Sequence, residues 1–315
     1  MRPIFKLTAG VICLIVSASC AIFSPERALI SAVQKGSISE AQRILNKGAD
    51  IDAVVAGLGT PLTVACAKGD VLFTIQLLKW GADIHQKDEH GLAPLFWAVS
   101  QGHADLTELL LDEGAKIDEA SGKGFDSLIT ACQYGYEKVA ELLIKAGADV
   151  NKPDKDGDTP LHWASAFGNS DLVGLLLDNG ADMRATNRNG ENPFQWAYIT
   201  GSMDVVKMYL VKGFDPNDPD KKGMTYLHKA AWDGDYSMVD LLLRSGAKVN
   251  ASDTRGALPI HYACRNGSLD IVKLLIQHGS KISEKTVDEK TPYMMAEEYQ
   301  HTAVMNYFKA KNITN

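Results

Sequence analysis

The sequence has no excess of positive charge. Its 32 lysines and arginines are outnumbered by 39 aspartates and glutamates, which gives a formal net charge of −7 at pH 7. A protein that binds nucleic acid needs a basic footprint for the phosphate backbone, so the composition argues against that class. The chain also lacks a low-complexity linker, a run of like charges and a coiled-coil heptad. Nothing in the composition therefore marks a boundary between compact domains.

The sequence also lacks the short motifs that carry common catalytic chemistry. It contains no G-x-S-x-G, H-E-x-x-H, C-x-x-C or G-x-x-x-x-G-K-[ST] segment. No pair of carboxylates stands out for acid–base work. We therefore predict no catalytic residue, no cofactor and no metal site.

The apolar run near the start is too short for a membrane span. Arg2 and Lys6 form a basic start, residues 7–16 are apolar, and the small residues 17–19 precede Cys20. A spanning helix needs about 20 apolar residues, so the pattern indicates an export signal over residues 1–19. The alternatives are ordinary cleavage nearby or an uncleaved anchor.

Small residues directly before a cysteine resemble a bacterial lipobox. This resemblance implies that Cys20 is lipidated and becomes the mature N-terminus. The expected location is then the bacterial cell envelope, lipid-anchored and facing the periplasm. Secretion is the alternative if the signal is simply removed.

The sequence pattern of residues 156–182 predicts a helix–turn–helix unit. Thr159 is suited to cap a helix that begins at Pro160, where a missing N–H costs nothing. Gly168 is suited to end that helix in the left-handed conformation. A second apolar-periodic helix follows and stops at Gly180. One such unit is too small to bury its own apolar faces.

The unit recurs with a fixed period of 33 residues. The positions equivalent to Thr159 are Thr60, Ala93, Asp126, Thr159, Asn192, Thr225, Leu258 and Thr291, and a further copy starts at Arg27. Most of the 27 glycines fall at three phases of this period. A period between 20 and 50 residues predicts a solenoid or array.

The T-P-L-H segment at 159–162, with Ala164, Gly168 and the closing residues 180–182, resembles an ankyrin repeat. Partial copies occur at Thr60-Pro61-Leu62, Ala93-Pro94-Leu95, Leu227-His228, Pro259-Ile260-His261 and Thr291-Pro292. The resemblance implies an all-α repeat solenoid of paired antiparallel helices with β-turn or hairpin loops. It covers residues 25–311, with a short tether at 20–24 and a tail at 312–315.

The ends of the array are expected to be polar caps, as a solenoid requires. Repeat one lacks the T-P-L-H turn and begins a helix with Ser24 and Pro25. In repeat nine, Glu289 and Gln300 replace two of the periodic glycines. We assign these two repeats as the N-terminal and C-terminal caps.

Several residues follow the period and are interpreted as structural. The histidines His162, His228 and His261 occupy the motif position and are expected to hydrogen-bond within and between turns. The acids Asp50, Asp83, Asp149 and Asp182 are expected to structure loops. Cys66, Cys132 and Cys264 take the phase of a small buried alanine, too far apart for a disulfide, so buried thiols are expected.

The position four residues after the Thr site carries Trp97, Trp163, Trp196 or Tyr262 in four repeats. The resemblance implies that these aromatics pack between the two helices of a repeat. Thr130 and Lys229 hold the same phase in repeats four and seven, which are expected to be locally less stable.

The candidate binding surface lies where the period fails. The resemblance implies that partners contact the loop tips and the last turn of each first helix, along a concave face. The aromatic candidates, which have no evident role in stacking, are Phe125, Tyr134, Phe167 and Trp232. The basic candidates are Lys123, Lys155, Arg188, Lys221, Lys222, Arg255 and Arg265. Such a face favours an acidic partner.

These observations favour a non-catalytic module that binds another protein and is tethered to a membrane. An inhibitor or immunity-type protein that blocks an enzyme or toxin is the alternative. An enzyme or small-molecule receptor with a site between repeats is a third hypothesis, which would require convergent polar groups outside the period.

Overall fold

The computed structural model describes residues 24–117 and 126–312. The predicted export signal, Cys20, Lys123 and Phe125 lie outside these residues. Within them the regular structure is helical, with no β-strand and one isolated bridge between Val55 and Gly59. The all-α prediction is confirmed. The described residues group into two compact units, which divide between Ser127 and Leu128 and are described separately.

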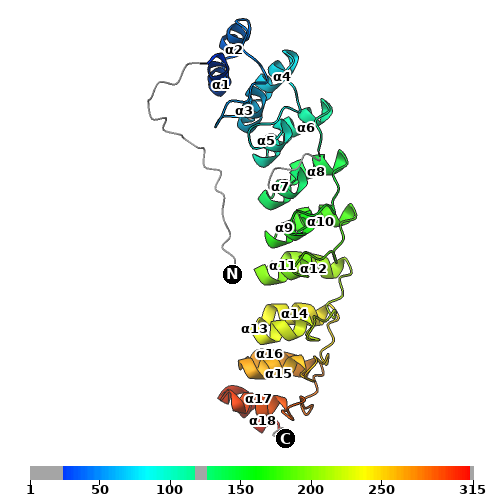
Figure 1. Cartoon of the computed structure of the whole chain (residues 1–315). Coiled ribbons are helices and arrows are strands. Elements are labelled where there is room, and N and C mark those ends of the chain that lie inside the picture. The colour runs from blue at the N-terminus through cyan, green and yellow to red at the C-terminus, as the bar shows by residue number, and fades with distance from the viewer. Residues whose placement is uncertain (1–23, 118–125, 313–315) are drawn as a thin grey trace. The chain divides into compact units, whose positions relative to one another are not determined.

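In the first unit, three helix pairs follow one another along the chain (Figure 1). They are α1 (Pro25–Lys35) with α2 (Ile38–Leu45), α3 (Pro61–Lys68) with α4 (Val71–Lys79), and α5 (Pro94–Ser100) with α6 (Ala104–Asp112). The first helices α1, α3 and α5 pack in sequence.

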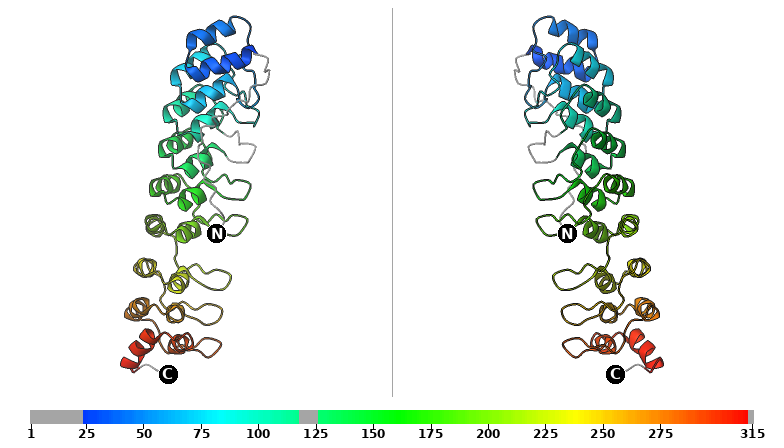
Figure 2. Two further views of the ribbon diagram at one scale, coloured as in Figure 1. Left: turned by 90° about the vertical axis from the view of Figure 1, so that its left-hand side faces the viewer. Right: turned by 90° about the vertical axis from the view of Figure 1, so that its right-hand side faces the viewer.

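The second unit is a longer run of the same hairpins, and α7 begins at its boundary (Figure 1). The helices are α7 (Ser127–Tyr134), α8 (Glu137–Lys145), α9 (Pro160–Ala166), α10 (Ser170–Asp178), α11 (Pro193–Thr200), α12 (Met203–Val211), α13 (Tyr226–Asp233), α14 (Tyr236–Arg244), α15 (Pro259–Asn266), α16 (Leu269–Gln277), α17 (Pro292–Glu298) and α18 (Thr302–Ala310). Within this unit the loops project past the first helices, on the side away from the second helices (Figure 2).

The helix boundaries of the central repeat confirm the sequence prediction. Thr159 is the extended N-cap of α9, and Pro160 is its first residue. Gly168 and Gly180 adopt φ of 70° and 86°, a left-handed conformation that a Cβ disfavours. The hairpin of the central repeat therefore turns at the glycine that the period predicted.

The motif histidines connect consecutive repeats. His162 Nδ1 accepts the backbone N–H of Thr159 at 3.1 Å, while Nε2 lies 3.0 Å from the Glu191 carbonyl of the next loop. His228 and His261 make the same two contacts in their own repeats. The predicted role within and between turns is confirmed. Because Nδ1 accepts, the bridging Nε2 carries the proton of a neutral ring.

The first and last helix pairs keep the local geometry of the internal repeats. The Ser24 hydroxyl accepts the Arg27 backbone N–H at 3.2 Å and starts α1. At the other end, Glu289 and Gln300 keep the positive φ of the glycines they replace, at 57° and 58°. The turns of the last repeat thus retain the geometry of the period without its favoured residue.

The predicted buried thiols are also found. Cys66, Cys132 and Cys264 are buried, and none is paired in a disulfide. Burial raises the pKa of the Cys66 thiol to about 12 and that of Cys264 further. Both therefore remain protonated and behave as small apolar side chains.

One step of the second unit is wider than its neighbours. First helices pack closely in the pairs α9–α11, α13–α15 and α15–α17, whereas α11 and α13 stand further apart (Figure 2). Aromatic rings fill this step: Phe194 stacks on Phe214 with centroids 4.1 Å apart and meets the edge of Tyr226 at 4.5 Å. Phe214 and Tyr226 stand at phases that carry alanine and proline in most repeats. We call these three residues and Tyr209 the aromatic junction.

Candidate functional site

In five of the described repeats, the loop tip is closed by one acidic or amide side chain. Asp154 Oδ1 accepts the backbone N–H groups of Asp156 and Asp158, both at 2.9 Å. The equivalent residues that make the same pair of bonds are Asp88, Asn187, Asp220 and Asp253. The tip is consequently held in a fixed turn.

The second carboxylate oxygen ties the loop to its own first helix. Trp97 Nε1 donates to Asp88 Oδ2 at 2.9 Å, and Trp163 Nε1 donates to Asp154 at 3.3 Å. The other members of the set are the Lys229–Asp220 ion pair at 3.1 Å and the Tyr262–Asp253 hydrogen bond. The position-four residues therefore have a polar role besides packing.

This link between loop and helix was missed in the sequence, although a signal exists. The acid stands nine residues before the position-four residue in all four repeats. In repeat six, where the acid is replaced by Asn187, the indole of Trp196 donates to Glu191 instead, at 3.2 Å. Lys229, expected to weaken its repeat, takes the place of the aromatic donor with its ammonium group.

Neighbouring loop tips are also bonded to each other. The Arg188 backbone N–H donates to the Asp156 carbonyl, the Thr254 N–H to Lys222, and the Val287 N–H to Arg255, at 2.8 to 3.0 Å. We call the surface made by these tips and by the last turns of the first helices in the second unit the loop face. The backbone that carries its side chains is bonded both to the first helices and, at these places, to the neighbouring tip.

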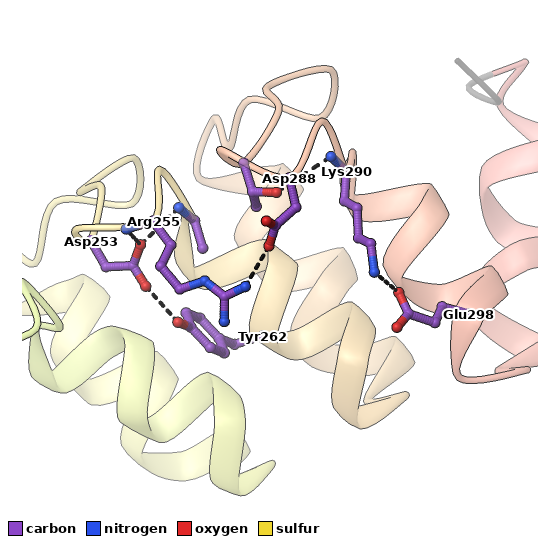
Figure 3. Close-up of polar contacts among 8 residues, drawn as sticks. Asp253, Arg255, Tyr262, Asp288, Lys290 and Glu298 are labelled. Carbon is purple, nitrogen blue, oxygen red and sulfur yellow. Dashed lines mark hydrogen bonds and ion pairs between the residues drawn. The ribbon is translucent and has the colours of Figure 1, made fainter.

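Five basic candidates of the loop face divide into two groups, and a sixth, Arg265, lies over the Trp232 ring. Lys155, Arg188, Lys221 and Lys222 are exposed at the tips, and no ion pair joins them to a carboxylate of the described chain. Arg255, by contrast, is paired with Asp288 (Figure 3). That hydrogen bond raises the pKa of the Arg255 guanidinium.

The aromatic candidates lie on the loop face and are partly packed against other residues of the repeats. Tyr134, Phe167 and Trp232 are 43%, 50% and 44% exposed. Phe167 stacks on Trp163 with centroids 6.3 Å apart, and Trp232 leans on Tyr262 at 5.1 Å. The expectation that these residues take no part in stacking is wrong for Phe167 and Trp232, because one side of each ring packs against a position-four aromatic.

Tyr134 occupies an equivalent place in repeat four. Its ring stacks on Tyr136, with centroids 5.8 Å apart. The candidates thus form separate half-exposed patches rather than one cluster, with Trp232 near Arg265 and the others in their own repeats.

A hollow of about 230 Å³ opens on this face between repeats eight and nine. Arg255, Tyr262 and Arg265 line it together with residues of the C-terminal cap. Tyr262 donates to Asp253 within repeat eight, and Lys290 pairs with Glu298 within repeat nine (Figure 3). Burial raises the pKa of Tyr262, and the bond to Asp253 raises it further, so the phenol remains a donor. The cap residues were missed in the sequence because the period weakens there.

The described residues show neither a metal-ligating cluster nor a membrane-spanning helix. Residues 24–117 and 126–312 contain no group of three or more side chains placed to hold a metal ion. None of the helices formed by these residues combines the length and apolar character needed to cross a bilayer.

The repeated hairpin, its glycine turns and its bridging histidines define an ankyrin-type repeat protein. The family model of ankyrin repeats in three copies matches residues 29–121, 62–154, 95–187, 161–253 and 250–315. The chain therefore belongs to the ankyrin-repeat family. A comparison with curated proteins gives no match.

A solved structure supports the same assignment. The chain is similar to the ankyrin repeat domain of Bcl-3, described as a unique member of the IκB protein family. The two share 30% identity with a TM-score of 0.62, over 69% of this chain and 100% of that domain. Repeats of this family are interaction modules, which points to a protein partner.

Proposed function

We propose that the chain is a non-catalytic binding protein that captures another protein on the loop face of its second unit. The observation that supports this most directly is the half-exposure of Tyr134, Phe167 and Trp232 on that face. Trp and Tyr are enriched at binding hot spots, and aromatic residues in general are enriched at the cores of interfaces. The Bcl-3 neighbour and the family membership favour the same function.

The mechanism is rigid presentation. Acids close the tips and tie them to their first helices in repeats five, seven and eight. Backbone hydrogen bonds join neighbouring tips at three places in this unit. Association is opposed by the ordering of loops and side chains at the interface. A surface that is already ordered before binding pays less of that cost.

The partner is expected to present acidic groups. Lys155, Arg188, Lys221 and Lys222 are exposed and have no carboxylate counterpart on the described chain. Complementary charges steer association and raise its rate. Raising the salt concentration should therefore slow partner capture. Replacement of the four basic residues by glutamine should reduce that salt dependence.

Partner capture from the native envelope tests the proposal. The wild-type chain, the Tyr134→Ala/Trp232→Ala double variant and the Tyr236→Ala control are used as bait, and the captured partner is then titrated in purified form. Tyr236 is similarly exposed, at 48%, but lies on the second helix α14. We expect the double variant to bind at least about tenfold more weakly. Equal affinity of the double variant and the control would remove the loop face as the site.

We further propose that the protein is exported and anchored through a lipid on Cys20. The basic start, short apolar run and small residues before this cysteine support the proposal. The test is the mass of the mature N-terminal peptide. An unmodified Cys20, or a mature chain that starts elsewhere, would remove the lipid anchor.

A further inference from the structure

The hollow between repeats eight and nine carries an unbalanced positive charge. Its charged lining residues are three cations, Arg255, Arg265 and Lys290, and two carboxylates, Asp288 and Glu298. Arg255 is paired with Asp288, and Lys290 with Glu298 (Figure 3). The charge left without a counterpart is that of Arg265.

Arg265 is held in place by two rings instead of an acid. Its guanidinium lies 4.6 Å from the ring centroid of Trp232 and 4.9 Å from that of Tyr299. Its side chain has no carboxylate within ion-pair distance among the residues that the structure describes. The backbone is fixed as well, because the Arg265 carbonyl lies 2.8 Å from His301 Nε2.

Contact with two aromatic faces leaves the edge of a guanidinium available. Rings that lie against the group act through its face, whereas its N–H donors point outward in its plane. A carboxylate matches two parallel N–H donors of arginine with good geometry. Arg265 is therefore arranged to receive a carboxylate without first breaking an ion pair.

We propose that this hollow binds one carboxylate of an aspartate or glutamate side chain of the partner protein. The inference rests on the proposed function and names the chemistry of one contact. The carboxylate pairs with Arg265, and the apolar part of the incoming residue lies against Met295 and Tyr299, which line the same hollow. A single negative charge matches the net charge of the lining, whereas a phosphate dianion would exceed it and face Asp288 and Glu298.

The binding is measured with a defined probe, without the natural partner. The full chain is labelled with ¹³C at the methionine methyl groups, and Met295 is followed by NMR. Met294, adjacent in sequence but absent from the hollow lining, is the internal control. The probe is the acetylated and amidated peptide Ala-Glu-Phe-Ala, compared with the same peptide carrying Gln in place of Glu, and with inorganic phosphate.

We expect a saturable shift of Met295 with the Glu peptide and none with the Gln peptide. Arg265→Gln should weaken binding about tenfold, since a charge-assisted hydrogen bond is lost. Arg244→Gln, which removes the same charge from the second helix α14, should not change binding. Asp288→Asn keeps the hollow and raises its positive charge, so it should tighten binding.

Equal shifts with the two peptides, unchanged binding by Arg265→Gln, or weaker binding by Asp288→Asn would each overturn the proposal. Tighter binding of phosphate than of the Glu peptide would do so too, by assigning the site to another ligand. The titration is independent of partner capture. If the peptide fails while the Tyr134→Ala/Trp232→Ala double variant still loses the partner, only the carboxylate site is wrong.

Discussion

At the scale of single residues, the tie between a loop acid and its first helix recurs in four of the described repeats. In repeat eight it joins the buried Asp253 to Tyr262, which is 7% exposed. Because the same carboxylate also accepts two backbone N–H groups, it acts as the centre of the loop. Loss of its side-chain donor leaves the acid partly unsatisfied, which is costly in a buried position.

Tyr262→Phe should lower the free energy of unfolding by about 1–3 kcal/mol, because a hydrogen bond to a buried charge is lost. Urea denaturation of the full chain measures the change. Tyr236→Phe, on the exposed side of α14, is the matched control and should have no effect. Equal stability of the two variants would show that the bond contributes nothing.

The bridging histidines make stability depend on pH. Burial lowers the pKa of His162, His228 and His261 below the usual 6.5, because the charged form of the ring loses its hydration. The unfolded chain then binds more protons in this range. The stabilisation is fully present above pH 6.5 and is lost as the pH falls through the lowered folded values.

Replacement of all three histidines by glutamine should flatten this dependence between pH 7.5 and pH 5. Glutamine fits the site, because Gln195 accepts the Asn192 backbone N–H at 2.8 Å at the same position of repeat six. Denaturation midpoints at both pH values measure the effect. A tenfold difference in proton affinity at one site corresponds to about 1.4 kcal/mol. An identical pH profile in wild type and triple variant would contradict the assignment.

At the scale of helices and turns, the C-terminal cap carries strain that the internal repeats avoid. Glu289 and Gln300 hold a left-handed backbone that glycine adopts without penalty. Glu289→Gly and Gln300→Gly should therefore each stabilise the protein by about 1 kcal/mol.

Thermal and chemical denaturation of these two variants provide the measurement. Glu297→Gly, at an exposed helical position of α17, is the control and should destabilise by about 1 kcal/mol. A loss of stability in all three variants would mean that the two turns are not strained.

Much of the arrangement of helices and turns could be predicted from the sequence. The phase of Gly168 and Gly180 locates both turns, because few other residues tolerate their φ. The wider step at α11 and α13 was not predicted. It depends on how Phe214 and Tyr226 pack against Phe194 across a repeat boundary, and periodicity alone does not give that packing.

The same limit applies to the loop face. The repeat positions at which the residue type varies are apparent from the 33-residue period, and Trp232 and Arg265 occupy two of them. The sequence does not predict the ring contacts of Trp232 or the position of Tyr299. Both depend on the directions in which side chains from different repeats point. Whether the tips bind a partner is a separate question, which the capture experiment addresses.

At the scale of the whole molecule, a repeat array is stabilised through contacts between neighbours. The aromatic junction tests this in the second unit, since Phe194 is fully buried and meets residues of repeats six and seven. Its removal should weaken the adjacent repeats first and the distant cap least.

Phe194→Ala should destabilise its surroundings by about 3–5 kcal/mol. Hydrogen exchange read by mass spectrometry should show a larger loss of protection in α13 than in α17. Leu161→Ala, at the same phase of repeat five, is the control and should affect α13 less. A uniform loss along the second unit would indicate one cooperative block instead of neighbour coupling.

The loop acid has one more consequence, for the way such a surface can change over evolutionary time. Asp154 secures the tip through backbone N–H groups, which every residue except proline supplies whatever its side chain. Positions such as Lys155 and Arg188 are therefore open to mutation with little penalty to folding. A lineage can explore new partners at these positions while the scaffold beneath them is inherited unchanged.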